Sequence, residues 1–214
     1  AAQAARAERC PLALVNLDAV AGLANRWIAK RASTRFAVGS EPPRPTGLGW
    51  TVINPIVKPS FKLLPTPAAA RTELGLAPDR PTLLVTGGSL GARSVNGFLL
   101  AFASAHTKVF TDQRWQVLHQ TGTGEDHAVS HAYTALGVDA VVTPLIARMD
   151  LAWTAADAAV GRAGAGTVAE AWATATPTLF MPYPYHKDQH QRRNAQPLDS
   201  AGAGLVATDR IDPG

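Results

Sequence analysis

Two glycine-rich stretches decide the fold: residues 82–91 read TLLVTGGSLG and residues 158–167 read AAVGRAGAGT. In each stretch, a short apolar run typical of a buried strand leads into glycines and then into a helix-like segment. Glycines let backbone N–H groups turn toward an anion, and the positive end of the following helix favours negative charge. The two stretches therefore predict a pair of strand–loop–helix units that bind phosphate.

The first loop has a structural explanation as well as a functional one. Its glycines, Gly87, Gly88 and Gly91, have a spacing that differs from the dinucleotide fingerprint. The loop could be no more than a tight turn between a strand and a helix. As a ligand loop, it would add the hydroxyl of Ser89 to its backbone donors.

The second loop, around Gly164 and Gly166, also leaves two explanations open. Thr167 and Glu170 have the spacing of a capping box, in which each side chain satisfies a backbone N–H at the helix start. Alternatively, the N–H groups of residues 165–167 would hold phosphate and Glu170 would accept two ribose hydroxyls. A second glycine loop at the same edge of the sheet favours a nucleotide diphosphate.

Strand-like and helix-like runs alternate through the second part of the chain. The expected strands are 82–86, 115–120, 140–143, 158–161, 178–182 and 205–207. The expected helices lie near 94–106, 125–136, 148–156, 167–175 and 188–201. This alternation predicts an α/β fold with a doubly wound, mostly parallel sheet and helices on both faces. Ligands of such sheets bind at the carboxyl ends of the strands, where both glycine loops fall.

The first part of the chain is a different region. We expect strands at 12–17 and 51–54, a helix at 19–32, and a proline-rich linker over 55–68. The predicted domains are the end of an N-terminal domain (1–57), a linker (58–80) and a C-terminal nucleotide-binding domain (81–214). The chain begins without Met and ends just after a strand-like run, so we expect it to be truncated at both ends.

The expected helix at 19–32 has an apolar side and a basic side. Leu23, Trp27 and Ile28 mark the apolar side. The basic residues are Arg26, Lys30 and Arg31, with Arg35 following. A membrane-surface location and an ordinary solvated face are both open explanations of the basic cluster.

Composition narrows the function classes. The chain is 46% hydrophobic and 17% charged, as in ordinary folded proteins, and no apolar run is long enough to span a membrane. A single cysteine, Cys10, excludes an internal disulfide framework. The net charge of +4 is small for a nucleic-acid-binding protein and suits an anionic ligand or an anionic membrane surface.

Histidines supply the remaining candidates. His186, Asp188 and His190 match no zinc spacing, so we expect no metal and favour a polar cluster that bonds sugar hydroxyls. The other explanation is a solvated helix start. His119 ends a predicted strand, and we favour a satisfied, partly buried histidine over a catalytic one.

Several motifs together resemble glycosyltransferase family 28, the two-domain, B-type enzymes that include the peptidoglycan N-acetylglucosaminyltransferases. The motifs are GGSLGARSVN (87–96), HQTGTGE (119–125), TPLIARMDLAWTAAD (143–157), GRAGAGTVAEAWA (161–173) and PYPYHKDQHQRRNAQPL (182–198), in the family's order. The stretch LVNLDAVAGLANRWIAKRA (14–32) resembles the end of the family's N-terminal domain.

The resemblance implies roles residue by residue. Ser89 would contact donor phosphate, the backbone of Ile146 would read uracil, and Glu170 would bind ribose. The implied donor-binding set is Ser89, Ile146, Ala165, Gly166, Thr167, Val168, Glu170, His190 and Gln191. The implied supporting residues of the loops are Gly87, Gly88, Gly91, Gly164 and Asn194. The catalytic base would lie upstream of Ala1, so we expect the fragment to bind donor weakly and to transfer nothing.

The implied reaction is an inverting transfer of N-acetylglucosamine from UDP-N-acetylglucosamine to a lipid-pyrophosphate-linked muramyl-peptide. It requires no cofactor and no nucleic acid, and it takes place on the cytoplasmic face of the bacterial inner membrane. The family's His-Glu pair and Asn are replaced in residues 15–18, and its arginine is lost or shifted to Lys58. Three alternatives stay open: a transferase with another lipid acceptor, a UDP-sugar 2-epimerase and a nucleotide-sugar-binding module.

Overall fold

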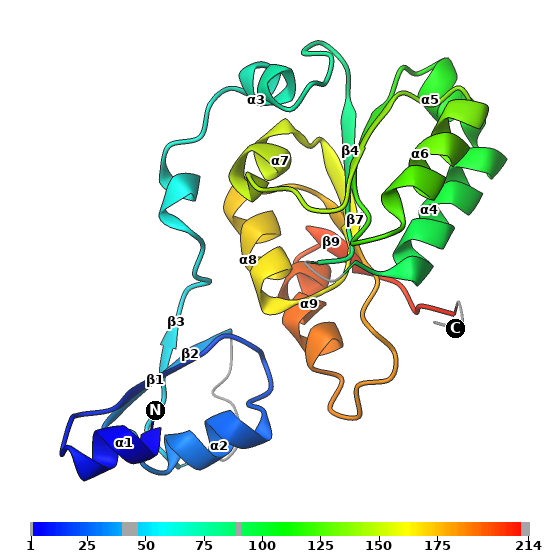
Figure 1. Cartoon of the computed structure of the whole chain (residues 1–214). Helices are drawn as coiled ribbons and strands as arrows, with labels where there is room; N and C mark the ends of the chain where they lie inside the picture. The colour runs from blue at the N-terminus through cyan, green and yellow to red at the C-terminus, as the bar shows by residue number, and fades with distance from the viewer. Residues whose placement is uncertain (1, 40–46, 89–90, 211–214) are drawn as a thin grey trace.

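Two parallel sheets organise the computed structural model, which describes residues 2–39, 47–88 and 91–210 (Figure 1). The smaller sheet has the strand order β1-β2-β3 and the larger has the order β6-β5-β4-β7-β8-β9. The strands are β1 (Ala13–Asn16), β2 (Thr34–Val38), β3 (Thr51–Ile53), β4 (Thr82–Thr86), β5 (Gln116–Gln120), β6 (Ala140–Thr143), β7 (Ala158–Gly161), β8 (Thr178–Phe180) and β9 (Gly204–Val206). The helices are α1 (Ala2–Ala7), α2 (Leu23–Ala29), η1 (Pro59–Lys62), α3 (Pro67–Glu73), α4 (Arg93–Ala105), α5 (Thr107–Thr111), α6 (Asp126–Ala135), α7 (Met149–Ala155), α8 (Ala165–Thr174) and α9 (His190–Ser200).

The larger sheet confirms the predicted doubly wound fold. Counted from β4 as its first strand, its order is 3-2-1-4-5-6, the order of dinucleotide-binding sheets, and every neighbouring pair is parallel. The strand order reverses between β4 and β7. These are the two strands that lead into the glycine loops, so both loops leave the sheet at its topological switch point.

Alternation along β4 explains why both faces are covered. Leu83 and Val85 pack into one buried cluster with residues of α4 and α6, such as Leu99. Leu84 points to the other face and packs with residues of α7 and α8, such as Trp153. Figure 1 shows α4, α5 and α6 on one side of the strands and α7, α8 and α9 on the other. Apolar side chains pack on both faces of the sheet and hold its strands, and therefore the strand ends, in place.

The N-terminal part differs from the sequence-based expectation. The helix covers only Leu23–Ala29, and β2 was not predicted. Two residues of the expected apolar side lie on the surface: Leu23 is 80% exposed and Trp27 is 40% exposed, whereas Ala29 is fully buried. Ile28 packs partly against the buried cluster around Ala29. The small cluster leaves the two larger side chains on the surface.

The proline-rich segment does not run free between the sheets. It contains the short helix η1, whose Phe61 is 8% exposed and belongs to the core of the larger sheet. Val57 and Leu64 pack against the same core. The expected linker is therefore anchored on the C-terminal part. No helix in the described part of the chain is long and apolar enough to cross a membrane.

Candidate nucleotide-binding site

Both glycine loops lie at the same edge of the larger sheet, as predicted. Thr86, the last residue of β4, pairs with Gly161 of β7 on one side and with Gln120 of β5 on the other. The strands thus end level with one another, and their following loops share one edge. The site hypothesis requires both glycine loops at one edge of the sheet, and the structure meets this requirement.

The first loop has a backbone that glycine alone adopts easily. Gly88 and Gly91 have φ values of +83° and +75°. A Cβ atom at Gly91 would lie 2.3 Å from the carbonyl oxygen of Thr121, so the loop passes close to the end of β5. A Cβ at Gly87 would meet the backbone of Ala92. Ser89 lies outside the described residues, and its predicted phosphate contact stays a prediction.

The second loop ends in an open helix start. Gly164 is the N-cap of α8, and among the described residues no side chain caps it. The first intrahelical bond runs from the N–H of Val168 to the Gly164 carbonyl, at 3.0 Å. A helix gives no internal partner to the N–H groups before that bond. They belong to residues 165–167, so the predicted phosphate donors are available, whereas Val168 has a bonded N–H and a side chain in the core.

The capping box does not form, because α8 begins at Ala165 with Gly164 as its N-cap, so Thr167 lies inside the helix and cannot cap it. Glu170 bonds a different group. Its Oε2 accepts a hydrogen bond from Nε1 of the buried Trp153, at 2.8 Å. The pKa of Glu170 is raised above its ordinary value, mainly by burial, although the Trp153 bond and the positive charge of Lys58 act in the opposite direction. Within the described residues, Oε1 takes part in no such bond. One oxygen of this half-buried carboxylate is held by Trp153, and the other can accept hydrogen bonds from ligand hydroxyls.

The end of β5 connects the first loop to the predicted uracil position. Nε2 of Gln120 donates to the Gly88 carbonyl at 2.8 Å, and its Oε1 accepts from the Ile146 N–H at 2.9 Å. The Ile146 N–H is therefore already bonded, and recognition of a base by this residue would use its carbonyl oxygen. Sequence reasoning missed Gln120, although its place at a strand end beside a glycine loop was visible.

His119 is a satisfied core residue, as favoured from the sequence. It is 0% exposed; its Nδ1 lies 3.0 Å from the Tyr133 hydroxyl and its Nε2 lies 3.0 Å from Oδ1 of Asn96. Desolvation by burial lowers the pKa of His119 to about 4. The imidazole is neutral at pH 7 and ties β5 to α4 and α6.

The loop before α9 makes its own polar cluster. His190 stacks on His186 with ring centroids 4.2 Å apart, and its Nδ1 lies 2.8 Å from Oδ1 of Asp188. The Gln191 Oε1 accepts from the Tyr183 N–H, at 2.9 Å. The predicted sugar-facing pair is therefore held by this loop, with Nε2 of Gln191 unused among the described residues.

Asn194 joins the two parts of the chain. Its Oδ1 accepts from the Ala19 N–H at 2.7 Å, and its Nδ2 donates to Asp18 Oδ1 at 2.9 Å and to the Ala163 carbonyl at 3.1 Å. Asp18 belongs to the segment that departs from the family pattern. The structure thus links this departure to the second glycine loop through Asn194.

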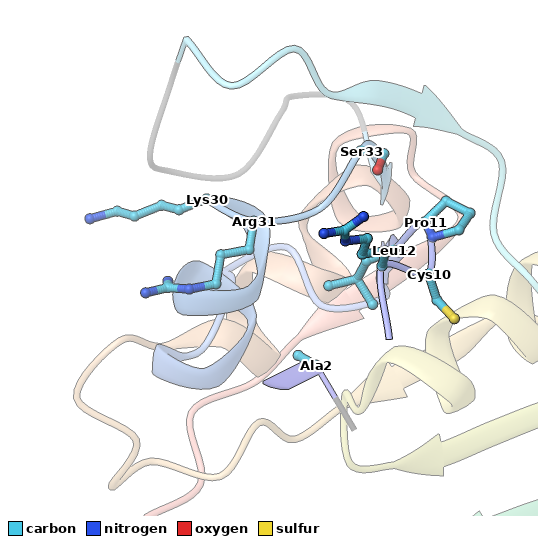
Figure 2. A pocket seen from close by; sticks show the side chains of 8 residues that line it. Ala2, Cys10, Pro11, Leu12, Lys30, Arg31 and Ser33 are labelled. Atoms are coloured by element: carbon cyan, nitrogen blue, oxygen red, sulfur yellow. The ribbon is translucent and has the colours of Figure 1, made fainter. Parts of the chain in front are cut away.

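Two further observations concern ligands. A hollow in the N-terminal part lies away from the predicted site (Figure 2). It is lined by Ala2, Arg9, Cys10, Pro11, Leu12, Lys30, Arg31 and Ser33. Among the described residues, no group of three or more His, Cys, Asp or Glu side chains is arranged to hold a metal ion.

The strand order and the two glycine loops are those of a doubly wound α/β domain of the B-type glycosyltransferase architecture. A family model, the glycosyltransferase family 28 C-terminal domain, matches residues 82–211. The match covers more than half of the chain, and the chain therefore belongs to glycosyltransferase family 28.

Relatives agree with this assignment. The chain is 42% identical over 214 residues to the UDP-N-acetylglucosamine--N-acetylmuramyl-(pentapeptide) pyrophosphoryl-undecaprenol N-acetylglucosamine transferase of Verminephrobacter eiseniae (strain EF01-2), covering 96% of this chain and 56% of that protein. The enzyme of the same name from Nocardioides sp. (strain ATCC BAA-499 / JS614) is 41% identical over 208 residues, covering 96% and 55%. The chain spans about half the length of the curated relatives it matches.

Solved structures give the same result. The crystal structure of Acinetobacter baumannii MurG is similar with a TM-score of 0.69 and 26% identity, covering 99% of this chain and 57% of that one. The glycosyltransferase SsfS6 from Streptomyces sp. SF2575 has a TM-score of 0.53 at 12% identity, covering 96% and 53%. The second likeness concerns the fold alone.

Proposed function

We propose that this chain carries the donor-binding half of an inverting glycosyltransferase. The enzyme would move N-acetylglucosamine from UDP-N-acetylglucosamine to a lipid-pyrophosphate-linked muramyl-peptide in peptidoglycan synthesis. The observation that carries the proposal is the convergence of two glycine loops, each followed by a helix, at the switch point of the larger sheet. The names of the relatives supply the sugar and the acceptor.

The diphosphate would lie on the open start of α8. The N–H groups of residues 165–167 have no acceptor within the helix, and the helix dipole adds positive potential at this point. Glycines at positions 87, 88 and 91 bring the backbone of the first loop to the same edge. We propose that these N–H groups stabilise the diphosphate charge, which other enzymes do with a metal ion, so that no cofactor is required.

The nucleoside and the sugar would extend to either side of the diphosphate. Glu170 has a free Oε1 among the described residues and would accept the ribose hydroxyls, while the Ile146 carbonyl would read uracil. His190 and Gln191 would bond the sugar hydroxyls from the loop before α9. Each role uses a group that the fold holds at the carboxyl edge of the sheet.

The proposed reaction is a single displacement. An acceptor hydroxyl oxygen forms a bond to the anomeric carbon, the bond from that carbon to the UDP oxygen breaks, and a base takes the hydroxyl proton. The leaving diphosphate gains negative charge in the transition state. Preorganised N–H groups stabilise such charge more strongly than they stabilise the ground state, because no reorientation is needed during the reaction.

Turnover by the full-length protein tests the reaction class. Labelled UDP-N-acetylglucosamine is supplied with and without a lipid-linked muramyl-peptide, and UDP release is measured. The proposal expects release that depends on the acceptor. Conversion of the sugar nucleotide without an acceptor would indicate an epimerase, whereas binding without turnover would indicate a binding module.

We also propose a peripheral location at the cytoplasmic face of an anionic bacterial membrane. Leu23 and Trp27 are exposed on α2, and the guanidinium of Arg31 lies 3.9 Å from the centroid of the Trp27 ring. Arg26 in the same short helix and Lys30 at its C-cap are also exposed, so apolar and basic groups share one surface. Arg35 does not join this cluster, because its guanidinium bonds backbone carbonyls including that of Leu48.

Vesicle co-sedimentation tests the membrane proposal. Each basic residue near an anionic bilayer contributes about 1 kcal/mol, so the double variant Arg26→Gln, Lys30→Gln should lose roughly 2 kcal/mol of binding. The matched control is a double variant of two basic residues on the C-terminal part, Lys108→Gln and Arg114→Gln, with unchanged binding. Equal binding of the unaltered protein to neutral and anionic vesicles would contradict the proposal.

A further inference from the structure

A buried arginine lies between the two glycine loops. Arg162 follows β7 directly and is 8% exposed. Its Nη1 donates to the Met181 carbonyl at 2.8 Å and to Oδ2 of Asp209 at 2.7 Å, and its Nη2 donates to Oγ of Ser94 at 2.7 Å. The Ser94 hydroxyl in turn donates to the same Asp209 oxygen, at 2.6 Å. The four groups form one connected cluster.

The cluster joins elements that are distant in the sequence. Ser94 lies in the first turn of α4, the helix that follows the first glycine loop. Arg162 lies two residues before Gly164, the N-cap of α8. Met181 and Asp209 follow β8 and β9. One guanidinium therefore fixes the start of α4 relative to the strand end from which α8 begins.

Stability alone is a weak reason for such a cluster. Taking a guanidinium and a carboxylate out of water costs free energy that the ion pair repays only with good geometry and further hydrogen bonds. The side chains of Arg162 and Asp209 are 10% and 1% exposed. The planar fork of arginine, unlike the point charge of lysine, fixes directions as well as distance. The ring of Tyr183 lies 5.6 Å from the guanidinium carbon and limits its movement.

We propose that Arg162 is a positioning residue for the nucleotide diphosphate. It sets the separation and relative direction of the starts of α4 and α8, so that the N–H groups of both loops point at one ligand. Arg162 acts through Ser94 and its own backbone and does not need to touch the donor. The inference rests on the proposed function, since it assumes that a diphosphate binds at this edge.

The chain offers a matched control at the opposite edge of the sheet. Arg71 is 9% exposed, and it too bonds an aspartate and backbone carbonyls: Asp157 Oδ2 at 2.7 Å, Ala155 at 3.0 Å and Pro78 at 3.1 Å. Its cluster lies at the amino ends of β4 and β7. The side chain of Asp157 is 44% exposed, against 1% for Asp209, so an equal substitution at Arg71 has a smaller structural cost. It removes an arginine–aspartate pair without disturbing the glycine loops.

The experiment compares Arg162→Lys with Arg71→Lys by calorimetric titration of UDP and by thermal melting. Both variants should lower Tm. Only Arg162→Lys should weaken UDP binding, by about tenfold, which corresponds to about 1.4 kcal/mol. An affinity for UDP equal to that of Arg71→Lys overturns the inference. If the unaltered chain itself binds no UDP, the proposed function fails and not merely the inference.

Ser94→Ala separates positioning from a direct contact and does not depend on the stability of the lysine variant. It removes the bridge to α4 and leaves the bond between Arg162 and Asp209 in place. We expect UDP binding about threefold weaker, which corresponds to about 0.65 kcal/mol. Unchanged UDP affinity in Ser94→Ala would mean that Arg162 does not act through α4, which overturns the inference even if Arg162→Lys binds poorly.

Discussion

The two ends of the larger sheet use similar residues and leave different backbone groups available. At the amino end, Asp157 Oδ2 accepts from Arg71 and also from the Thr82 N–H, at 2.7 Å each. Gln116 closes the same end by pairing both its amide groups with the backbone of Ala77. The polar groups there bond one another, which joins the strand starts into a closed network.

At the carboxyl end the buried polar groups hold the loops and do not cover them. Gln120 and Arg162 bond the surroundings of the two glycine loops. The N–H groups of residues 165–167 remain without an acceptor in their helix. An edge is therefore not made into a binding site by having more polar residues. It becomes one when buried side chains fix the loops from behind and leave the backbone donors in front.

The largest expected difference between the two ends concerns two glycines with the same φ. Gly75, at the amino end, and Gly91, at the carboxyl end, both have φ +75°. Among the described residues, a Cβ at Gly75 meets nothing within 4 Å, whereas one at Gly91 lies 2.3 Å from the Thr121 carbonyl oxygen. Gly75→Ala should cost about 1 kcal/mol of backbone strain. Gly91→Ala should cost about 4 kcal/mol, strain and overpacking together.

Urea unfolding measures both glycine variants, with UDP titration beside it. Gly91→Ala should also abolish UDP binding, because the first loop must move away from β5. Equal stabilities of the two variants would show that the close approach of Gly91 to Thr121 is wrong.

The second difference is in pH dependence. Gln116 and His119 occupy β5 near its two ends, and only His119 titrates. Its folded pKa, about 4, lies below the unfolded value of 6.5, so the unfolded chain binds the proton more tightly. Its contribution to stability is therefore present above pH 6.5 and is lost as pH falls toward 4, by about 3 kcal/mol.

The control for this pH effect is His119→Gln, which keeps a polar group between Asn96 and Tyr133. Unfolding free energies are measured from pH 4 to pH 8 for both proteins. The difference between them should shrink as pH falls. A constant difference across this range would mean that His119 keeps an ordinary pKa and is not desolvated.

The sequence predicted the larger sheet well because its signals are local. Each strand is a short apolar run, and two of the strands lead directly into glycines that mark the turn to the next helix. The N-terminal helix was predicted poorly for the opposite reason. Leu23 and Trp27 are apolar, but whether they are covered depends on how much core the small sheet provides. The sequence alone does not contain that information.

In the candidate site too, the features set by local sequence were predictable and those set by distant packing were not. The glycine loops, Glu170 and the open start of α8 follow from motifs. The partners of Arg162 do not, because Asp209 is 47 residues away and Ser94 is 68 residues away. The capping box was a reasonable local alternative, but α8 begins before Thr167, and Glu170 bonds Trp153 of α7. Side-chain pairs between distant elements are set by packing, and no short-range pattern reports them.

The third difference concerns one carboxylate at each end of the sheet, Glu170 and Asp157. Glu170→Gln keeps an oxygen that can accept from Trp153, but it removes the charge that would bind ribose hydroxyls. UDP binding should weaken by about 1.5–3 kcal/mol for each bond affected. Asp157→Asn should instead lower the free energy of unfolding by about 1–3 kcal/mol and leave UDP affinity unchanged. Calorimetric titration and thermal melting of both variants give the comparison. A lower Tm with unchanged UDP affinity in Glu170→Gln would return Glu170 to a structural role.

The smallest difference concerns two exposed ion pairs of nearly equal geometry. Arg93 and Glu125 lie 3.3 Å apart at the carboxyl end, and Arg114 and Asp79 lie 3.4 Å apart at the amino end. Exposed pairs of this kind contribute about 0–1 kcal/mol to the free energy of unfolding. The Tm of Arg93→Gln and of Arg114→Gln should therefore lie within a few degrees of that of the unaltered protein. Only Arg93 opens a helix, α4, that starts beside the proposed diphosphate position.

Because charge acts over roughly 10 Å at 0.1 M salt, Arg93→Gln should weaken UDP binding by about twofold at low salt, and the loss should disappear near 1 M. Arg114→Gln should bind UDP normally at every salt concentration. Equal UDP affinities for the two variants at low salt would place the anion outside the reach of α4. That outcome would leave α8 alone as the phosphate site and would contradict the two-loop arrangement.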